Sequence, residues 1–144
     1  MPFRTPSEVP QAVADIWNTY VRSQFEDDYH DDLMRVFEPY VPVPARDFSW
    51  GFDTATGPSL VEAAAVDDAP ANSTAAFAHA VAALGLRYNV DRLRSGGVWF
   101  HGSMRIEGVR VRFECSVFDR AAADVAIGNV RDHVSGERRA AQRQ

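Results

Sequence analysis

The feature of the sequence that most constrains the fold is the stretch VWFHGSMRIEGVRVRFECSVF, at residues 98–118. Two runs in this stretch alternate apolar and polar residues, and the dipeptide Glu107-Gly108 separates them. Alternation with a period of two is typical of a strand that buries one face. A glycine between two such runs is typical of a tight turn, because glycine adopts positive φ without strain. The stretch therefore predicts an antiparallel β-hairpin.

The register of this hairpin sorts its side chains into two faces. A two-residue turn pairs Ile106 with Val109, and the pairs on that face are apolar apart from one glycine. The other face pairs Trp99 with Ser116, His101 with Glu114, Ser103 with Arg112, and Arg105 with Arg110. A slip of one residue would exchange the two faces, so the pattern specifies the register strongly. We expect one face to be core and the other polar.

The N-terminal part, residues 7–37, predicts helix. Its apolar residues recur at spacings of three and four, which marks one buried stripe: Val13, Ile16, Trp17, Tyr20, Val21, Phe25, Tyr29, Leu33, Val36 and Phe37. Pro39 ends the pattern, because proline cannot continue a helix. One long helix and two helices broken near Asp28 both fit the spacing.

The middle of the chain predicts two or three further strands and a second helix. Residues 48–52 alternate as a strand, whereas residues 59–67 fit either a helix or a strand that returns from a turn; the hairpin spacing favours the strand. Asn72 is expected to cap an alanine-rich helix over residues 73–84, and Gly85 to end it. Leu86, Tyr88 and Val90 alternate as another strand.

The C-terminal part predicts a short helix and a tail. Asp119 is expected to cap the helix and Gly128 to end it, and residues 136–144 lack an apolar stripe and are expected to form a disordered basic tail. The prediction is thus one α+β domain over residues 1–135. Its mainly antiparallel sheet of four or five strands is packed on one face by a long N-terminal helix and the 73–84 helix.

Composition narrows the functional classes. The chain of 144 residues has a net charge of −5 and one cysteine, Cys115, which excludes an internal disulfide. We find no signal peptide and no apolar run long enough to span a membrane, so we expect a cytoplasmic protein. All 15 basic residues are arginine, which is typical of a high-GC bacterium or its phage.

The polar face of the hairpin carries the candidate partner-binding residues Trp99, His101, Arg105, Arg110, Arg112 and Glu114. Three environments are open to the arginines: water, the protein's own carboxylates, such as those of residues 26–32, or an external anion or acidic partner. An exposed Trp99 would favour a protein interface. A histidine opposite a carboxylate, as at His101, could also serve as a general base.

The acidic segment FEDDYHDDL, at residues 25–33, is the second candidate site. On a helix, Asp27, His30 and Asp31 would share a face and could supply part of a metal site. The sequence places no further histidine nearby, so we predict neither a metal nor a cofactor. The carboxylates of Asp27, Asp28, Asp31 and Asp32 are expected to form an acidic surface or to cap a helix.

Three functional hypotheses follow from these patterns. The first is a non-enzymatic binding or adaptor protein, of a kind that a phage or mobile element could encode, that uses the arginine-bearing sheet face, the acidic segment or both. Its partner would be another protein or a second copy of the chain. The second is a small enzyme or small-molecule-binding domain with a polar pocket on the sheet. The third is a binder of phosphate or a nucleic-acid backbone, which the negative net charge opposes.

Overall fold

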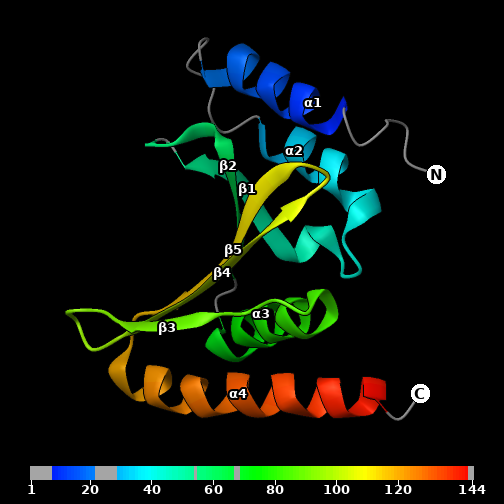
Figure 1. Cartoon of the computed structure of the whole chain (residues 1–144). Coiled ribbons are helices and arrows are strands. Elements are labelled where there is room, and N and C mark those ends of the chain that lie inside the picture. Colours follow the sequence, from blue (N-terminus) through cyan, green and yellow to red (C-terminus); the bar gives the residue numbers. More distant parts are fainter. Residues whose placement is uncertain (1–7, 22–28, 54, 67–68, 143–144) are drawn as a thin grey trace.

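A mixed five-stranded sheet forms the centre of the structure, a computed structural model that describes residues 8–21, 29–53, 55–66 and 69–142 (Figure 1). The strands are β1 (Phe48–Asp53), β2 (Gly57–Ala65), β3 (Asn89–Arg92), β4 (Val98–Ile106) and β5 (Val109–Val117). The α-helices of the described residues are α1 (Glu8–Ile16), α2 (Tyr29–Phe37), α3 (Pro70–Leu84) and α4 (Arg120–Gln142). Short helical turns are η1 (Trp17–Val21), η3 (Glu38–Tyr40) and η4 (Ala45–Asp47).

The sheet is mainly antiparallel, as predicted, and the α+β class is confirmed. Its strand order is β1-β2-β5-β4-β3, and only β2 and β5 run parallel. This pair places Leu60 beside Arg110 and Ala64 beside Glu114. Along the sequence, α3, β3 and β4 lie between β2 and β5. The parallel pair therefore joins the N-terminal strands of the sheet to the C-terminal strands.

The β4–β5 hairpin has the predicted register, from the pair Ile106–Val109 to the pair Val98–Val117. Glu107 and Gly108 in its turn have φ angles of 50° and 86°. Two successive positive φ angles are typical of a type I′ turn, whose twist matches that of the flanking strands. The glutamate is an unusual residue at this position, and the alternation on both strands outweighs its local preference.

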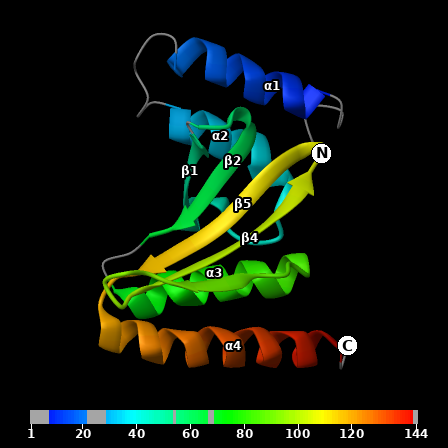
Figure 2. The ribbon, with the colours of Figure 1, turned by 60° about the vertical axis from the view of Figure 1, so that its left-hand side comes forward.

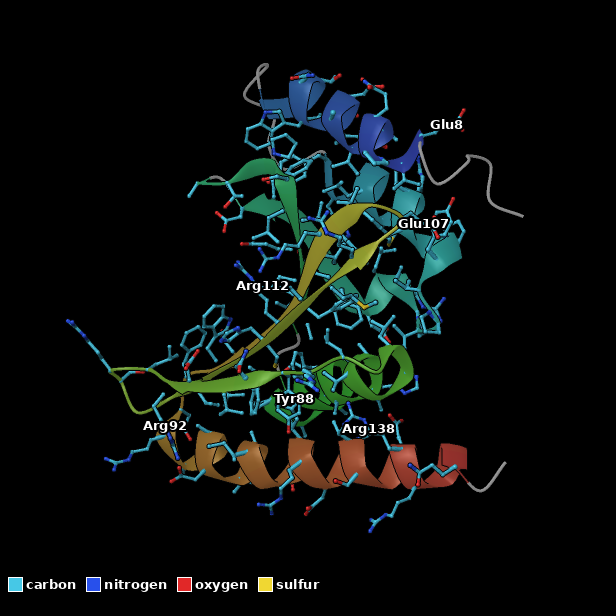
Figure 3. The ribbon with its side chains drawn as sticks, viewed as in Figure 1. Glu8, Tyr88, Arg92, Glu107, Arg112 and Arg138 are labelled. Carbon is cyan, nitrogen blue, oxygen red and sulfur yellow. The ribbon has the colours of Figure 1, made fainter. Side chains whose placement is uncertain are left out.

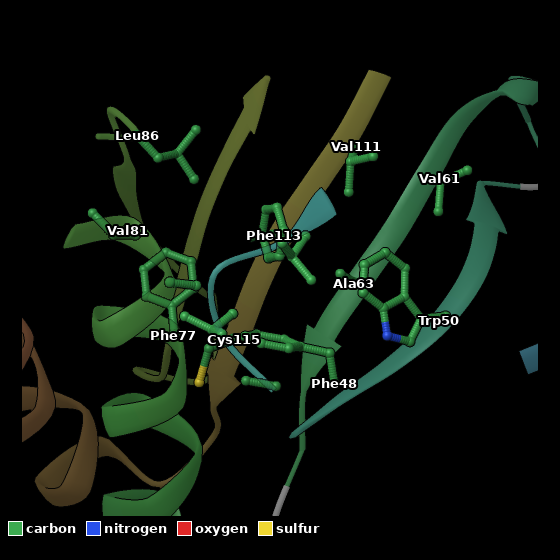
Figure 4. Packing of buried hydrophobic residues seen from close by; sticks show 14 of the residues in the cluster. Phe48, Trp50, Val61, Ala63, Phe77, Val81, Leu86, Val111, Phe113 and Cys115 are labelled. Carbon is green, nitrogen blue, oxygen red and sulfur yellow. The ribbon is translucent and has the colours of Figure 1, made fainter. Parts of the chain in front are cut away.

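The apolar face of the sheet packs on α2 and α3. Phe37 of α2 stacks on Trp50 of β1 with ring centroids 5.3 Å apart. Phe77 of α3 lies 5.8 Å from Phe100 of β4. Figure 4 shows Phe113 of β5 between Phe77 and Trp50, so that aromatic rings form a continuous layer across the sheet. Burying one such ring contributes about 1.5–3 kcal/mol, so this layer supplies much of the stability.

The two segments that the sequence left open have definite structures. β2 extends over residues 57–65, so the strand alternative holds for the first part of residues 59–67. In residues 7–37, α1 and α2 contact one another (Figure 1), which one continuous helix would prevent. Two helices are therefore present, which is the second of the two alternatives, and α2 packs against β1. The expected break near Asp28 lies outside the described residues.

α3 begins earlier than the sequence predicted. Its first residue is Pro70, not Ser73 after an Asn72 cap. Proline suits this position because it has no N–H to leave unpaired. The Thr74 hydroxyl donates to the Pro70 carbonyl at 2.8 Å, within the first turn. The end of α3 is confirmed, because Gly85 has a left-handed φ of 63°.

β3 begins later than predicted and covers only Asn89–Arg92. Leu86, expected in this strand, is instead buried against Gly102 of β4. The carbonyl of Arg87 approaches the same glycine so closely that no side chain would fit there. Residues 86–88 therefore pass over β4 and cannot pair beside it.

α4 is longer than predicted and passes through Gly128 to Gln142. Residues 136–142, predicted as a disordered tail, belong to this helix. The reason is tertiary packing: buried Ala126, Val130 and Val134 continue one stripe past the glycine, against α3. Such packing outweighs the roughly 1 kcal/mol that glycine costs within a helix.

The polar face of the sheet has no helix over it in the described part of the chain. Figure 2, in which this side comes forward, shows no helix in front of β2 and β5, with α1 beyond one end of the strands and α3 and α4 toward the other end. None of the helices that the structure describes is both long and apolar enough to cross a membrane.

Candidate functional site

The candidate site is this uncovered side of the sheet, which we call the open face. Its side chains come from all five strands, because each strand contributes every second residue. Figure 3 shows Arg112 of β5 projecting from the sheet on the side opposite the helices. The predicted partner-binding residues of β4 and β5 all lie here: Trp99, His101, Arg105, Arg110, Arg112 and Glu114.

Arg112 is the centre of an ion-pair cluster on the open face. Its guanidinium binds the carboxylate of Glu62 on β2, and its Nε lies 3.1 Å from Glu114 Oε2 on its own strand. A third carboxylate, that of Asp53 on β1, lies 3.6 Å away. The side chains are only 18–29% exposed. Of the three environments open to the arginines, Arg112 therefore has the protein's own carboxylates, and those of the described residues come from β-strands.

The cluster has more negative than positive charge, and Glu62 shows the effect. Burial raises the pKa of the Glu62 carboxyl above its usual value, the charge of Glu114 raises it further, and Asp53 adds to the rise. The Arg112 guanidinium opposes this shift without cancelling it. Three carboxylates share one guanidinium, so the cluster keeps unused capacity to accept hydrogen bonds.

Trp99 and His101 form the aromatic part of the open face. Their rings stack with centroids 3.7 Å apart, and the Arg112 guanidinium lies 5.6 Å from the tryptophan ring. The predicted cross-strand pair of His101 and Glu114 is confirmed, but the His101 ring contacts another carboxylate. His101 Nε2 instead lies 2.5 Å from Asp91 Oδ2 on β3, because Glu114 is engaged by Arg112.

Arg105 and Arg110 lie at the turn end of the hairpin and are exposed. They are cross-strand neighbours, and we call them the basic row. Arg110 Nη2 donates to the Ser103 hydroxyl at 3.3 Å, and Arg105 Nη1 donates to the Gly108 carbonyl at 3.3 Å. Neither guanidinium has a carboxylate partner among the ion pairs of the described residues, so both charges are available to an external group.

Charge on the open face changes sign along the strands. The basic row carries two positive charges. One step along the strands is the central row of Ser103, Arg112 and Glu62, which together with the nearby Asp53 carboxylate carries one positive and two negative charges. The next steps bring Glu114 and then Asp91, each negative, which we call the acidic end. The face is therefore dipolar, with its positive end at the hairpin turn.

The acidic segment has a structural role in the part that is described. His30 Nδ1 accepts a hydrogen bond of 2.9 Å from the Trp50 backbone N–H, on the outer edge of β1. Asp32 accepts one of 2.6 Å from the Tyr20 hydroxyl, and Asp31 is exposed. Asp27 and Asp28 lie outside the described residues. No group of three histidine, cysteine or acidic side chains within the described ranges could hold a metal ion.

Sequence reasoning missed a second polar cluster, between α3 and α4. Glu137 Oε1 lies 2.8 Å from His79 Nδ1 and 3.1 Å from His133 Nε2, beside a cavity of about 540 Å³. The sequence gives no sign of this contact, because it depends on the continuation of α4 past Gly128. Sequence reasoning also missed Asp53, Glu62 and Asp91 on the open face, since only strand pairing places them there.

Cys115 is buried on the apolar face, as its register predicted. Burial raises the pKa of its thiol above the usual value, while a hydrogen bond with Ser73 lowers it less. The thiolate is the reactive form, so this side chain is poorly suited to act as a nucleophile.

Comparison with protein-family models, with curated protein sequences and with solved structures gave no match.

Proposed function

We propose that the chain is a non-enzymatic protein-binding module and that the open face is its binding surface. The observation that supports this most is the helix-free face of a five-stranded sheet, whose opposite face carries the core. It presents an aromatic side chain, Trp99, beside the ion pairs of Arg112. Tryptophan and arginine are the residues most enriched among those that dominate binding energy in protein interfaces.

A nucleic-acid backbone is a poorer partner for this face. Arg112 is occupied by carboxylates, and the acidic end would repel phosphates. Only the basic row offers free guanidinium groups, and two charges are few compared with the contacts that backbone binding usually requires. We propose a protein partner, in the cytoplasm as the sequence leads us to expect.

Photo-crosslinking in cells of the source organism tests the proposal. A photoreactive amino acid replaces Ser116, an exposed residue of the open face next to Trp99. The matched control replaces Ser135, which is exposed on α4. We expect protein adducts from position 116 and none of comparable yield from position 135. Equal yields, or no adduct from the open face, would contradict the proposal.

A further inference from the structure

We propose that the partner of the open face is a second copy of this chain, bound face to face about a two-fold axis. The inference rests on the proposed function, because it names the partner of the same surface. Its basis is the dipolar charge of that surface: the basic row lies at one end, and Glu114 and Asp91 lie at the other.

The strand geometry makes this surface complementary to itself. Same-face residues along a strand are about 6.6 Å apart, so the central row lies midway between the basic row and Glu114. We place the two-fold axis along the central row, in the plane of the interface and across the strands. Rotation about this axis makes the strands of the second copy run opposite to those of the first. Arg110 of each copy then faces Glu114 of the other, while Arg105 faces His101 on the same strand. The contact forms twice, as an isologous interface requires. Face-to-face sheets keep their strand directions within about 30°, which this antiparallel arrangement satisfies.

The residues at the axis do not oppose this arrangement. Arg112 of one copy would approach Arg112 of the other, but each guanidinium already binds carboxylates of its own chain. Glu114 keeps unoccupied acceptor positions beside its bond to Arg112, because a carboxylate accepts up to about four hydrogen bonds. It can therefore accept a further guanidinium from Arg110 of the second copy.

The open face is also of suitable size. The nine-residue strands β2, β5 and β4 form the middle of the face, and the shorter β1 and β3 lie at its edges. With strands about 4.8 Å apart and a rise of about 3.3 Å per residue, the face is about 19 Å wide and up to about 30 Å long. A stable interface typically buries about 800 Å² of accessible surface on each partner. Projecting side chains add accessible surface, so the whole face is needed to approach that area and either end alone is too small.

Trp99 gives the interface an apolar contact. The two-fold axis brings this side chain to the hairpin-turn end of the second copy. A cavity of about 440 Å³ opens there, lined in part by Pro58, Arg105, Gly108 and Arg110. An aromatic side chain in such a hollow excludes water from neighbouring charges, and a guanidinium can stack on its ring.

A charge-swap experiment tests the proposal by sedimentation equilibrium of the full chain. The basic-row variant combines Arg105→Glu and Arg110→Glu, and the acidic-end variant combines Asp91→Arg and Glu114→Arg. We expect the wild type to dimerise and each variant alone to dissociate, with a dissociation constant increased on the order of a hundredfold, because like charges then face each other. An equimolar mixture of the two variants is expected to form a heterodimer.

A matched control combines Arg131→Glu and Arg139→Glu on the exposed side of α4, which changes the net charge equally and is expected to leave the dimer intact. A monomeric wild type at every concentration, or a mixture that fails to associate, would overturn the second-copy inference. Crosslinks from position 116 to a different protein would then still support the proposed function, whereas their absence would overturn both.

Discussion

At the scale of single residues, the informative feature is the charge imbalance between the one guanidinium of Arg112 and the three carboxylates around it. One guanidinium binds the carboxylates of Glu62 and Glu114 and lies near that of Asp53. A buried carboxylate that lacks full compensation is held at a cost to stability. The cluster therefore lowers the free energy of unfolding, and it leaves carboxylate oxygens at the surface that can accept further hydrogen bonds.

Glu62 makes this cost measurable as a function of pH. Its pKa is raised in the folded protein, so the folded state holds the proton more tightly than the unfolded state does. Its favourable contribution is present below the unfolded pKa and is lost as pH rises through the folded pKa. We expect the melting temperature of Glu62→Gln, relative to wild type, to rise by about 1–2 °C between about pH 4 and pH 7, a small effect because solvent screens this group.

Thermal unfolding monitored by circular dichroism at each pH measures this difference. Glu62→Gln also loses its ion pair with Arg112, but the net rise of the Glu62 pKa already includes that attraction, so the trend with pH is the quantity of interest. Ser116→Ala on the same face is the control, because it removes no titrating group. A difference that stays constant or falls with rising pH would contradict the interpretation of the cluster.

At the scale of elements, the sequence predicted best where one local pattern decides the structure. The β4–β5 hairpin needs only alternation and a glycine, and its register was correct throughout. The end of α3 at Gly85 likewise depends on one residue. α4 could not be predicted in this way, because Gly128 is locally a stop signal and only contact with α3 overrides it.

The same limit applies to the candidate site. Trp99, His101, Arg105, Arg110, Arg112 and Glu114 were found because they share one hairpin. Glu62 reaches Arg112 through a parallel pairing 50 residues apart, and Asp91 reaches His101 from β3. No pattern within either segment indicates such a pairing. Sequence reasoning therefore located the surface and its arginines but missed three of the four carboxylates that its described residues carry, those of Asp53, Glu62 and Asp91.

Glycine substitutions test the continuity of α4. Gly128 has only the Arg131 side chain near its position for a Cβ, at 3.8 Å, and Gly136 has nothing within 4 Å. We expect Gly128→Ala and Gly136→Ala each to stabilise the protein by about 0.5–1 kcal/mol, because alanine restricts the unfolded chain and suits a helix. Urea denaturation measures this. In contrast, Gly97→Ala would collide with the backbone of Val117 and Phe118 and is expected to destabilise.

A neutral or destabilising result for both α4 substitutions would show that the helix is interrupted at these glycines. Gly97→Ala is the reference in this comparison, because it shows how much stability is lost when a Cβ meets neighbouring backbone.

At the scale of the whole molecule, the end of α4 connects distant parts of the chain. Glu137 binds His79 of α3 at 2.8 Å, and Arg138 Nη2 donates to the Leu86 carbonyl at 2.9 Å. Both contacts lie beyond residue 135, where the sequence placed the domain boundary. The C-terminal segment therefore helps to hold α3 against the rest of the molecule.

Truncation after Ser135 tests this role. Removal of residues 136–144 deletes the contacts of Glu137 and Arg138, and we expect a loss of about 1–2 kcal/mol in the free energy of unfolding, at about 0.5–1.5 kcal/mol for each hydrogen bond. Removal of residues 141–144 alone keeps both contacts and is the control. Equal stability of the two truncated proteins in urea would show that the domain does end near residue 135.

The position of β5 has a consequence for how the protein is made. β5 is the last strand along the chain, yet it lies in the middle of the sheet, between β2 and β4. A ribosome that has not yet released β5 therefore holds a sheet in two unjoined parts, each with an open inner edge. Long-range pairing of this kind slows folding. The nascent chain must keep these edges apart from other chains until β5 has been made.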